Sequence, residues 1–156
     1  MLVLGVDPGS RVTGYGLIEK DHNRMTCIQA GVITPPPKAP FYERIHHIFQ
    51  SMLDIMSEYS PLELAIEEVF FAKNVQSSLK LGHARGAVLI AAVESGLKIF
   101  EYSPLEIKKS TVGYGRASKE QVRSMVKMIL NLKSEPLLDA SDALATAICH
   151  LNWKRF

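Results

Sequence analysis

Residues 2–10 of the chain read Leu2-Val3-Leu4-Gly5-Val6-Asp7-Pro8-Gly9-Ser10. The apolar run predicts a buried strand over residues 2–7, and the Pro-Gly pair predicts a tight turn directly after it. Asp7 therefore stands at the carboxyl end of a buried strand. An ionised carboxylate beside a strand core is costly to desolvate unless a cation or donors compensate it. Asp7 thus indicates a functional site.

Two further acids lie on a predicted helix that starts near Leu138 or Asp139 and runs to about Trp153. Asp139 and Asp142 are three residues apart, so both project from one face of that helix near its first turn. Their neighbours are mostly apolar, which predicts that the helix packs on the sheet. An alternative is that Asp139 caps the helix and Asp142 adds a favourable first-turn charge.

The pair Glu67-Glu68 belongs to another predicted strand, at residues 62–69. Side chains alternate along a strand, so these two acids point to opposite faces of the sheet. Only one of them can join Asp7, and the strand pattern alone does not say which.

Four carboxylates from separate elements are typical of a site for hard divalent cations. Mg²⁺ takes oxygen ligands and keeps several waters. In two-metal phosphodiester cleavage, one ion activates the attacking water and the other stabilises the leaving oxygen. The acids therefore favour a metal-dependent phosphoryl-transfer enzyme.

The composition describes one globular domain, residues 1–156, with 47% hydrophobic and 22% charged residues. The longest apolar run, residues 87–93, is too short to cross a bilayer, so no membrane partner is expected. The first residues lack a basic, cleavable leader, and Cys27 and Cys149 lack metal-type spacing. These features predict a cytoplasmic protein with free thiols. The net charge of +2 gives little indication of a nucleic-acid partner.

Hydrophobic periodicity predicts alternating strands and helices along most of the chain. Strands are expected at residues 2–7, 14–18, 25–34, 62–69 and 98–102, and helices at 42–59, 76–96, 104–111, 118–130 and 138–153. A Gly-rich loop covers residues 113–116, and Ser118 is a candidate N-cap. Three meander strands followed by alternating elements predict an α/β domain with a mixed sheet.

Four blocks of the sequence form a recognisable set: Gly5-Val6-Asp7-Pro8-Gly9-Ser10-Arg11-Val12-Thr13-Gly14-Tyr15-Gly16, Ala65-Ile66-Glu67-Glu68-Val69-Phe70-Phe71-Ala72-Lys73-Asn74, Leu79-Lys80-Leu81-Gly82-His83-Ala84-Arg85-Gly86 and Asp139-Ala140-Ser141-Asp142-Ala143-Leu144-Ala145. With them the chain resembles the RuvC family of Holliday junction resolvases over essentially its whole length. A single Asp-x-Gly occurs in many folds, whereas this set in this order and spacing is specific.

The resemblance implies a ribonuclease H-like fold, a mixed β-sheet flanked by helices, and a homodimer. It implies an endodeoxyribonuclease that resolves four-way DNA junctions by paired symmetric nicks, giving 5′-phosphate ends, in homologous recombination and DNA repair. The implied cofactor is Mg²⁺ or Mn²⁺, with two ions per active site. A branch-migration complex of the RuvA–RuvB type is the implied protein partner.

The resemblance also assigns roles to individual residues. The metal-binding and catalytic acids would be Asp7, Glu67, Asp139 and Asp142. It thereby selects Glu67 over Glu68. Lys108 and Lys119 match basic positions near the active site, where a cation can offset charge on the scissile phosphate in the transition state. A solvated surface charge is the alternative for each lysine.

Contacts to DNA are expected from Phe70, Phe71, Lys73, Arg116 and Ser118. Phe70 matches an aromatic residue that the family uses against a junction base, and a flat ring can stack on a splayed base. The residues alone would also allow ordinary core positions for the two phenylalanines. The loop before Ser118 offers backbone donors to a phosphate.

Residues 74–92 match the helix that the family uses for dimerisation, and its face carries Leu79, Gly82, His83 and Gly86. A helix packed inside one subunit would look the same.

Three other functions remain open from the sequence. A non-catalytic junction-binding module would keep the aromatic residue and the basic loop but could dispense with the four acids. An ATP-binding domain of the actin or sugar-kinase type also places Asp-x-Gly-Ser after a strand, yet that architecture normally needs two related domains. A ribonuclease H-fold nuclease for another structured nucleic acid is the closest alternative.

Overall fold

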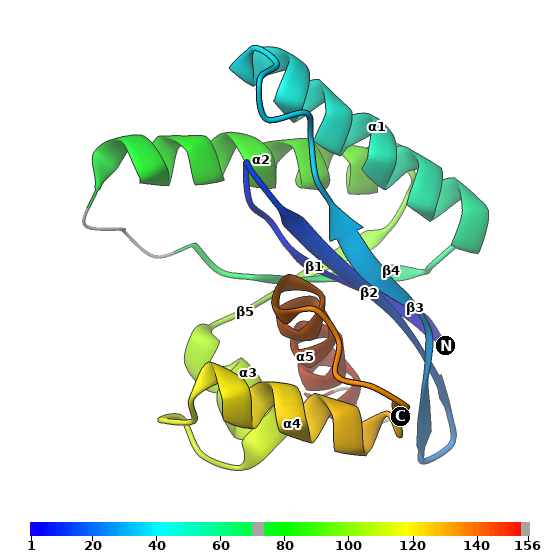
Figure 1. Ribbon diagram of the computed structural model, residues 1–156. Coiled ribbons are helices and arrows are strands. Elements are labelled where there is room, and N and C mark those ends of the chain that lie inside the picture. The colour runs from blue at the N-terminus through cyan, green and yellow to red at the C-terminus, as the bar shows by residue number, and fades with distance from the viewer. Residues whose placement is uncertain (70–73, 154–156) are drawn as a thin grey trace.

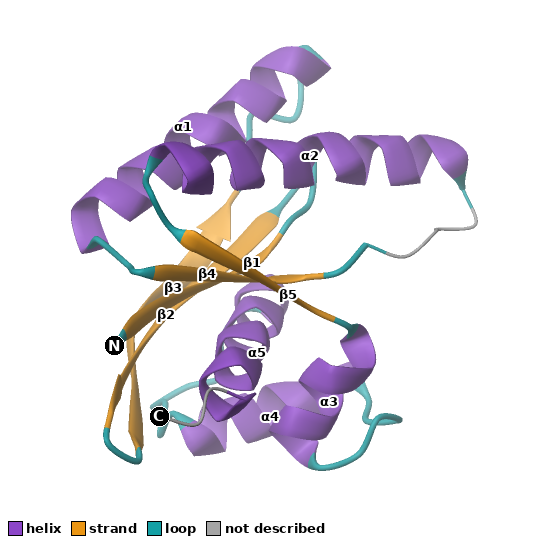
Figure 2. Ribbon diagram, turned by 180° about the vertical axis from the view of Figure 1, so that it is seen from behind, coloured by secondary structure: helices purple, strands orange, loops and turns teal. Residues whose placement is uncertain are grey.

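The computed structural model describes residues 1–69 and 74–153, which form a five-stranded mixed sheet between two helical layers (Figures 1 and 2). The strands are β1 (Leu2–Asp7), β2 (Thr13–Asp21), β3 (Arg24–Ile33), β4 (Glu63–Glu67) and β5 (Lys98–Tyr102). The helices are α1 (Phe41–Tyr59), α2 (Val75–Glu94), α3 (Pro104–Val112), α4 (Lys119–Ile129) and α5 (Leu138–Trp153). The predicted α/β class with a mixed sheet is confirmed.

The strand order in the sheet is β3-β2-β1-β4-β5. The first three strands form an antiparallel meander, and β4 and β5 run parallel to β1. The carboxyl ends of β1, β4 and β5 therefore meet at one edge of the sheet. This edge is where an open α/β sheet usually carries its functional site.

Two predicted strands differ in length from those in the structure. The strand expected at 14–18 runs from Thr13 to Asp21, because its hairpin turn is short and His22 adopts a positive φ of 52°. The strand expected at 62–69 ends at Glu67, and Glu68 and Val69 are exposed beyond it.

Helices α1 and α2 cover one face of the sheet (Figure 1). Side chains of alternate strand residues, such as Leu4, Val6, Leu64 and Ile66, form the core on this face with both helices. Helix α1 supplies a buried stripe of Ile48, Met52 and Met56 at helical spacing. This spacing is the periodicity that predicted the helix.

Helix α5 lies directly on the opposite face, with α3 and α4 packed against it (Figure 2). The helix approaches β1 so closely that a Cβ on Gly5 would stand 2.0 Å from the carbonyl oxygen of Ala143. Glycine at this position is what allows the helix backbone to reach the sheet. Val3, Ala65, Leu144 and Ile148 belong to the core on this side.

Capping residues fix the starts of the helices that border the site. Ser103 and Glu106 form a capping box at α3, and Ser118 and Gln121 form one at α4. The predicted N-cap at Ser118 is confirmed. Each box satisfies backbone N–H groups that the first helical turn leaves without partners.

A buried polar chain joins α5 to β4 and β5. His150 Nε2 lies 2.6 Å from Glu63 Oε2, and its Nδ1 lies 2.7 Å from the Tyr102 hydroxyl. The His150 side chain has no exposed surface, and that of Glu63 is 7% exposed. Buried polar groups need partners of this kind, so the chain fixes α5 against the parallel strands. Over the two described ranges, no helix has the length and apolar character that a bilayer crossing needs.

Candidate active site

Strand alternation brings Asp7 and Glu67 to the same face of the sheet. On β1, Asp7 has the parity of Val3 and Gly5, which face α5. On β4, Glu67 has the parity of Ala65, which lies in the α5 core, whereas Glu68 has that of Ile66 on the other face. Gly5 pairs with Ala65 in the parallel ladder, so Asp7 and Glu67 end adjacent strands. The sheet thus provides a geometric reason for choosing Glu67 over Glu68.

Helix α5 carries the other two acids, Asp139 and Asp142, near its N-terminus, close to the carboxyl ends of the parallel strands. A Cβ on Gly14 would lie 2.0 Å from the carbonyl oxygen of Asp139, so the first turn of α5 rests against the β2 backbone. Gly14 is the cross-strand partner of Asp7. This close approach places the first turn of α5, with Asp139 and Asp142, beside the end of β1.

One pocket, of about 210 Å³, gathers most of the predicted catalytic residues. It is lined by Asp7, Glu67, Pro104, Ile107, Lys108, Lys119, Val122, Asp142, Ala145 and Thr146. Lys119 Nζ lies 3.5 Å from Asp142 Oδ2. Lys108 comes from α3 and Lys119 from α4, so two capped helices supply the positive side of the pocket.

The clustering of acids changes their proton affinity. The pKa of Asp7 rises to about 7, chiefly because of burial and then because of the charges of Asp142, Glu67 and Asp139, while the charge of Lys119 lowers it. Burial together with the charge on Asp142 also raises the pKa of Glu67. Burial is the larger cause of both shifts, and the charges of neighbouring carboxylates add to it.

The lysines limit this repulsion on the α5 side. Burial raises the pKa of Asp142, and the charge and hydrogen bond of Lys119 lower it, as does the charge of Lys108. The pocket therefore combines a concentration of negative charge with two cations at its border. Perturbed carboxylates in a cleft are typical of functional sites.

The carboxylates that line the pocket are suitable ligands for a divalent cation. Asp7, Glu67 and Asp142 supply hard carboxylate oxygens from three separate elements to one pocket. Bound cations would remove the repulsion that raises the pKa values. Within residues 1–69 and 74–153, no three Asp, Glu, His or Cys side chains stand in a closed coordination geometry. Water ligands are usual for Mg²⁺, which needs few protein ligands.

Asp139 is close to this pocket without lining it. Its charge acts on Asp7 and Asp142, yet its side chain borders a neighbouring open pocket that also contains Gly9, Ser10, Arg11 and Lys80. The structure thus brings together five of the six predicted catalytic residues and places the sixth at the rim.

Two of the predicted DNA contacts, Arg116 and Ser118, precede α4, and the other three lie outside the described residues. Arg116 is exposed in the loop before α4, and the Ser118 hydroxyl accepts a hydrogen bond from the backbone N–H of Gln121. Phe70, Phe71 and Lys73 fall in the range that the structure does not describe. Their DNA contacts stay predictions.

Sequence reasoning assigned no role to Arg85 or to the glycines under α5. Arg85 is a largely buried cation whose guanidinium contacts the strand end at Glu67. Gly14 and Gly16 lie two residues apart on one strand and so share a face of the sheet. Two such glycines could have predicted that a helix backbone approaches this strand closely.

Comparison with known proteins places this geometry in a family. A family model described as crossover junction endodeoxyribonuclease RuvC matches residues 3–150. The chain belongs to the RuvC family. A Geobacter metallireducens relative with that name is 51% identical over 97% of this chain and 93% of its own length. A Magnetococcus marinus relative of the same name is 46% identical over 99% of this chain and 86% of its own length.

Solved structures of RuvC proteins share the fold. The structure of T. thermophilus RuvC in complex with a Holliday junction substrate superposes with a TM-score of 0.92 at 35% identity, covering 98% of this chain and 94% of that one. The yeast mitochondrial Holliday junction resolvase Ydc2 has a TM-score of 0.65 at 15% identity, covers 97% of this chain and 79% of that one, and supports the fold alone. The predicted ribonuclease H-like fold is confirmed.

Proposed function

We propose that the chain is a structure-selective endodeoxyribonuclease that resolves four-way DNA junctions by paired, metal-dependent nicks. The observation that carries the proposal is the convergence of Asp7, Glu67 and Asp142 on one pocket beside two lysines. Family membership supports it, because the relatives that match along nearly the whole chain are named as crossover junction endodeoxyribonucleases. The T. thermophilus relative was solved with a Holliday junction substrate.

The pocket divides the catalytic tasks between acids and lysines. Asp7, Glu67, Asp139 and Asp142 would hold divalent ions. When bound, the ions supply an activated water and stabilise the leaving 3′ oxygen, so the products carry 5′-phosphate ends. Lys108 and Lys119 would contact the scissile phosphate and offset the negative charge that grows in the transition state.

A divalent-metal requirement follows from membership of this nuclease family. We propose Mg²⁺ or Mn²⁺ as the ion and two ions per active site. Oxygen-only ligands favour both over softer metals. Four acids are enough for two ions with one shared carboxylate.

The proposed substrate is a four-way junction bound by a homodimer of one-domain subunits, each spanning residues 1–156. Two active sites related by a two-fold axis match a junction with the same symmetry and explain paired nicks. We further propose a RuvA–RuvB type branch-migration complex as partner, in homologous recombination and DNA repair. The expected cytoplasmic location stays a prediction.

Cleavage of a labelled four-way junction beside a linear duplex of the same sequence tests the proposal. We expect symmetric nicks in the junction alone, dependent on Mg²⁺ or Mn²⁺ and abolished in EDTA and in Asp7→Asn. The variant should still bind the junction, because phosphate contacts dominate DNA affinity. The exposed Asp54→Asn, on α1, is the matched control and should cleave normally.

Each alternative function gives a different result. Tight junction binding without cleavage in either metal would favour a non-catalytic binding module. Equal cutting of duplex and junction would leave a nuclease without structure selectivity. ATP binding by calorimetry, together with no cleavage, would favour the actin-like or sugar-kinase-like reading.

A further inference from the structure

Arg85 lies on α2, on the side of the sheet opposite to the pocket with the two lysines. Its side chain is 11% exposed, although it carries a permanent charge. Its Nη2 donates to Glu101 Oε2 at 2.6 Å and to the backbone carbonyl of Glu67 at 3.4 Å. Removing a cation from water is costly, so a buried arginine requires acceptors placed for it.

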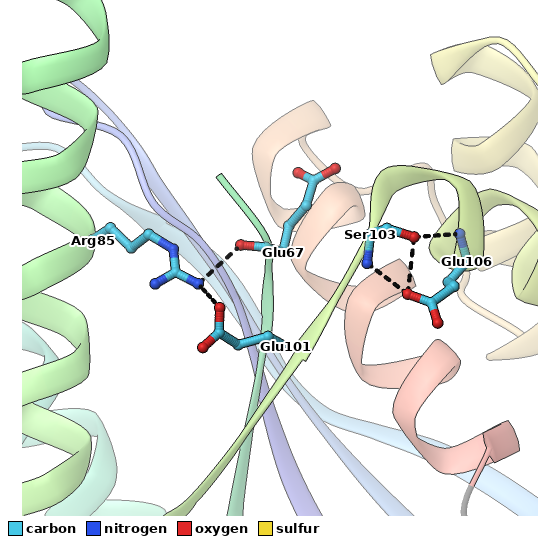
Figure 3. Close-up of polar contacts among 5 residues, drawn as sticks. All are labelled: Glu67, Arg85, Glu101, Ser103 and Glu106. Atoms are coloured by element: carbon cyan, nitrogen blue, oxygen red, sulfur yellow. Dashed lines mark hydrogen bonds and ion pairs between the residues drawn. The ribbon is translucent and has the colours of Figure 1, made fainter. Parts of the chain in front are cut away.

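Figure 3 shows how these groups are arranged around Glu67. The carbonyl oxygen of Glu67 points toward the Arg85 guanidinium, whereas the Glu67 carboxylate extends away from it. The backbone of Glu67 is therefore held from the α2 side of the sheet, while its side chain points to the α5 side. Glu101, next along β5 to Tyr102, keeps the guanidinium in place.

The strand end needs such a tether. Strand β4 ends at Glu67, and the residues directly after it are exposed. Beyond that end, the backbone N–H of Glu68 donates to the Tyr102 carbonyl at 2.8 Å. Arg85 adds its contact from the α2 side of the sheet. A cavity of about 220 Å³ at the strand end is lined by Asp7, Glu67 and Arg85, among other residues. Loose space beside a ligand makes its backbone anchor important.

We infer that Arg85 is a positioning residue that fixes the Glu67 carboxylate for metal binding from the opposite face of the sheet. The inference rests on the proposed role of Glu67 as a metal ligand. Both contacts are made by one nitrogen, Nη2, at the tip of the guanidinium. The ammonium nitrogen of Lys stands one bond nearer the backbone, so we expect the conservative change to lose these contacts. One Arg85 atom, Nε, is buried without a hydrogen-bond partner in the described ranges, so the site has no surplus of acceptors.

The test uses the full chain and measures Mn²⁺ binding by calorimetry without DNA. We expect Arg85→Lys to weaken Mn²⁺ binding by about 10-fold or more, the usual consequence of losing a group that orients a ligand. Junction affinity in EDTA should stay within about twofold of wild type, because Arg85 is expected to touch no phosphate. Glu101→Gln keeps an acceptor for the guanidinium and should weaken Mn²⁺ binding less, in the same direction.

The matched control is Arg123→Lys. Arg123 likewise donates to a backbone carbonyl, that of Pro136, at 2.7 Å, and lies 3.6 Å from Glu135. It is not among the residues of the catalytic pocket. Arg123→Lys should lower thermal stability about as much as Arg85→Lys does, and it should leave Mn²⁺ affinity unchanged.

Two results would overturn the inference. Equal Mn²⁺ affinity in Arg85→Lys and Arg123→Lys would make Arg85 a structural residue only. Loss of junction binding with unchanged Mn²⁺ affinity would make it a DNA contact. Should Arg85→Lys fail to fold, Glu101→Gln decides between the same outcomes.

Glu67→Gln separates this inference from the proposed function. If that variant loses Mn²⁺ affinity and Arg85→Lys does not, the positioning role fails and the metal site stands. If Glu67→Gln binds Mn²⁺ as well as wild type does, the positioning role of Arg85 and the metal-binding role of Glu67 both fail.

Discussion

Substituting Asp7 by Asn should make the metal-free protein more stable while abolishing its activity. The pKa of Asp7 rises from 3.8 to about 7 in the folded chain, first because of burial and then because of the neighbouring carboxylates. A folded pKa above the unfolded one means that ionising Asp7 opposes folding. The unfavourable contribution is fully present above about pH 7 and fades as the pH falls toward 3.8.

The size of this effect follows from the pKa shift. Each unit corresponds to about 1.4 kcal/mol, so the difference between 3.8 and about 7 gives an upper limit of about 4 kcal/mol. Asn keeps the shape of the side chain and carries no charge. We expect Asp7→Asn to gain up to about 4 kcal/mol at pH 8.5 and less than about 1 kcal/mol at pH 4. For a domain of this size the gain at high pH is about 8–16 °C in Tm.

Urea unfolding in EDTA at pH 8.5 and at pH 4 measures both values. The control Asp54→Asn makes the same charge change at an exposed position on α1 and should alter stability little at either pH. Adding Mg²⁺ should stabilise the wild type and leave Asp7→Asn unchanged, since only the former binds the ion. An Asp7→Asn protein that is no more stable than wild type at pH 8.5 would show that burial and the neighbouring carboxylates do not disfavour ionised Asp7.

Three further predictions concern groups that build the site. Glu67→Gln should abolish junction cleavage and Glu68→Gln should retain it, as a gel assay of the two variants will show, because strand parity directs only the former to the pocket. Gly14→Ala should lower stability by about 1–3 kcal/mol and weaken Mn²⁺ binding, because its Cβ would meet the first turn of α5 at 2.0 Å. A urea midpoint for Gly14→Ala equal to that of the wild type would contradict the close approach. His150→Ala should lower the free energy of unfolding by about 3–5 kcal/mol by taking a buried partner from a β4 carboxylate, and a loss under 1 kcal/mol in urea would argue against that role.

Local patterns were sufficient to predict the elements. Apolar runs, alternation and helical spacing identified the five strands and five helices that the structure describes, because the apolar side chains of each element mark the faces it buries. Strand ends were less predictable. The strand at Glu63–Glu67 stops earlier than its apolar pattern suggests, since continued pairing depends on its neighbours in the sheet.

The sequence identified the four acids as candidate site residues, but it did not show that they lie close together. Asp7 stood out because it follows a buried strand, whereas choosing Glu67 over Glu68 required the family pattern or the register between β1 and β4. Arg85 was missed because its contacts are with a backbone carbonyl and a residue sixteen positions away. Such contacts leave no local periodicity.

Anomalous scattering from crystals grown with Mn²⁺ and an uncleaved junction would locate the metal ions directly. We expect two peaks about 3.5–4 Å apart, both within coordination distance of carboxylates from Asp7, Glu67, Asp139 and Asp142. Peaks located elsewhere, with the four acids free of metal, would contradict the proposed metal site.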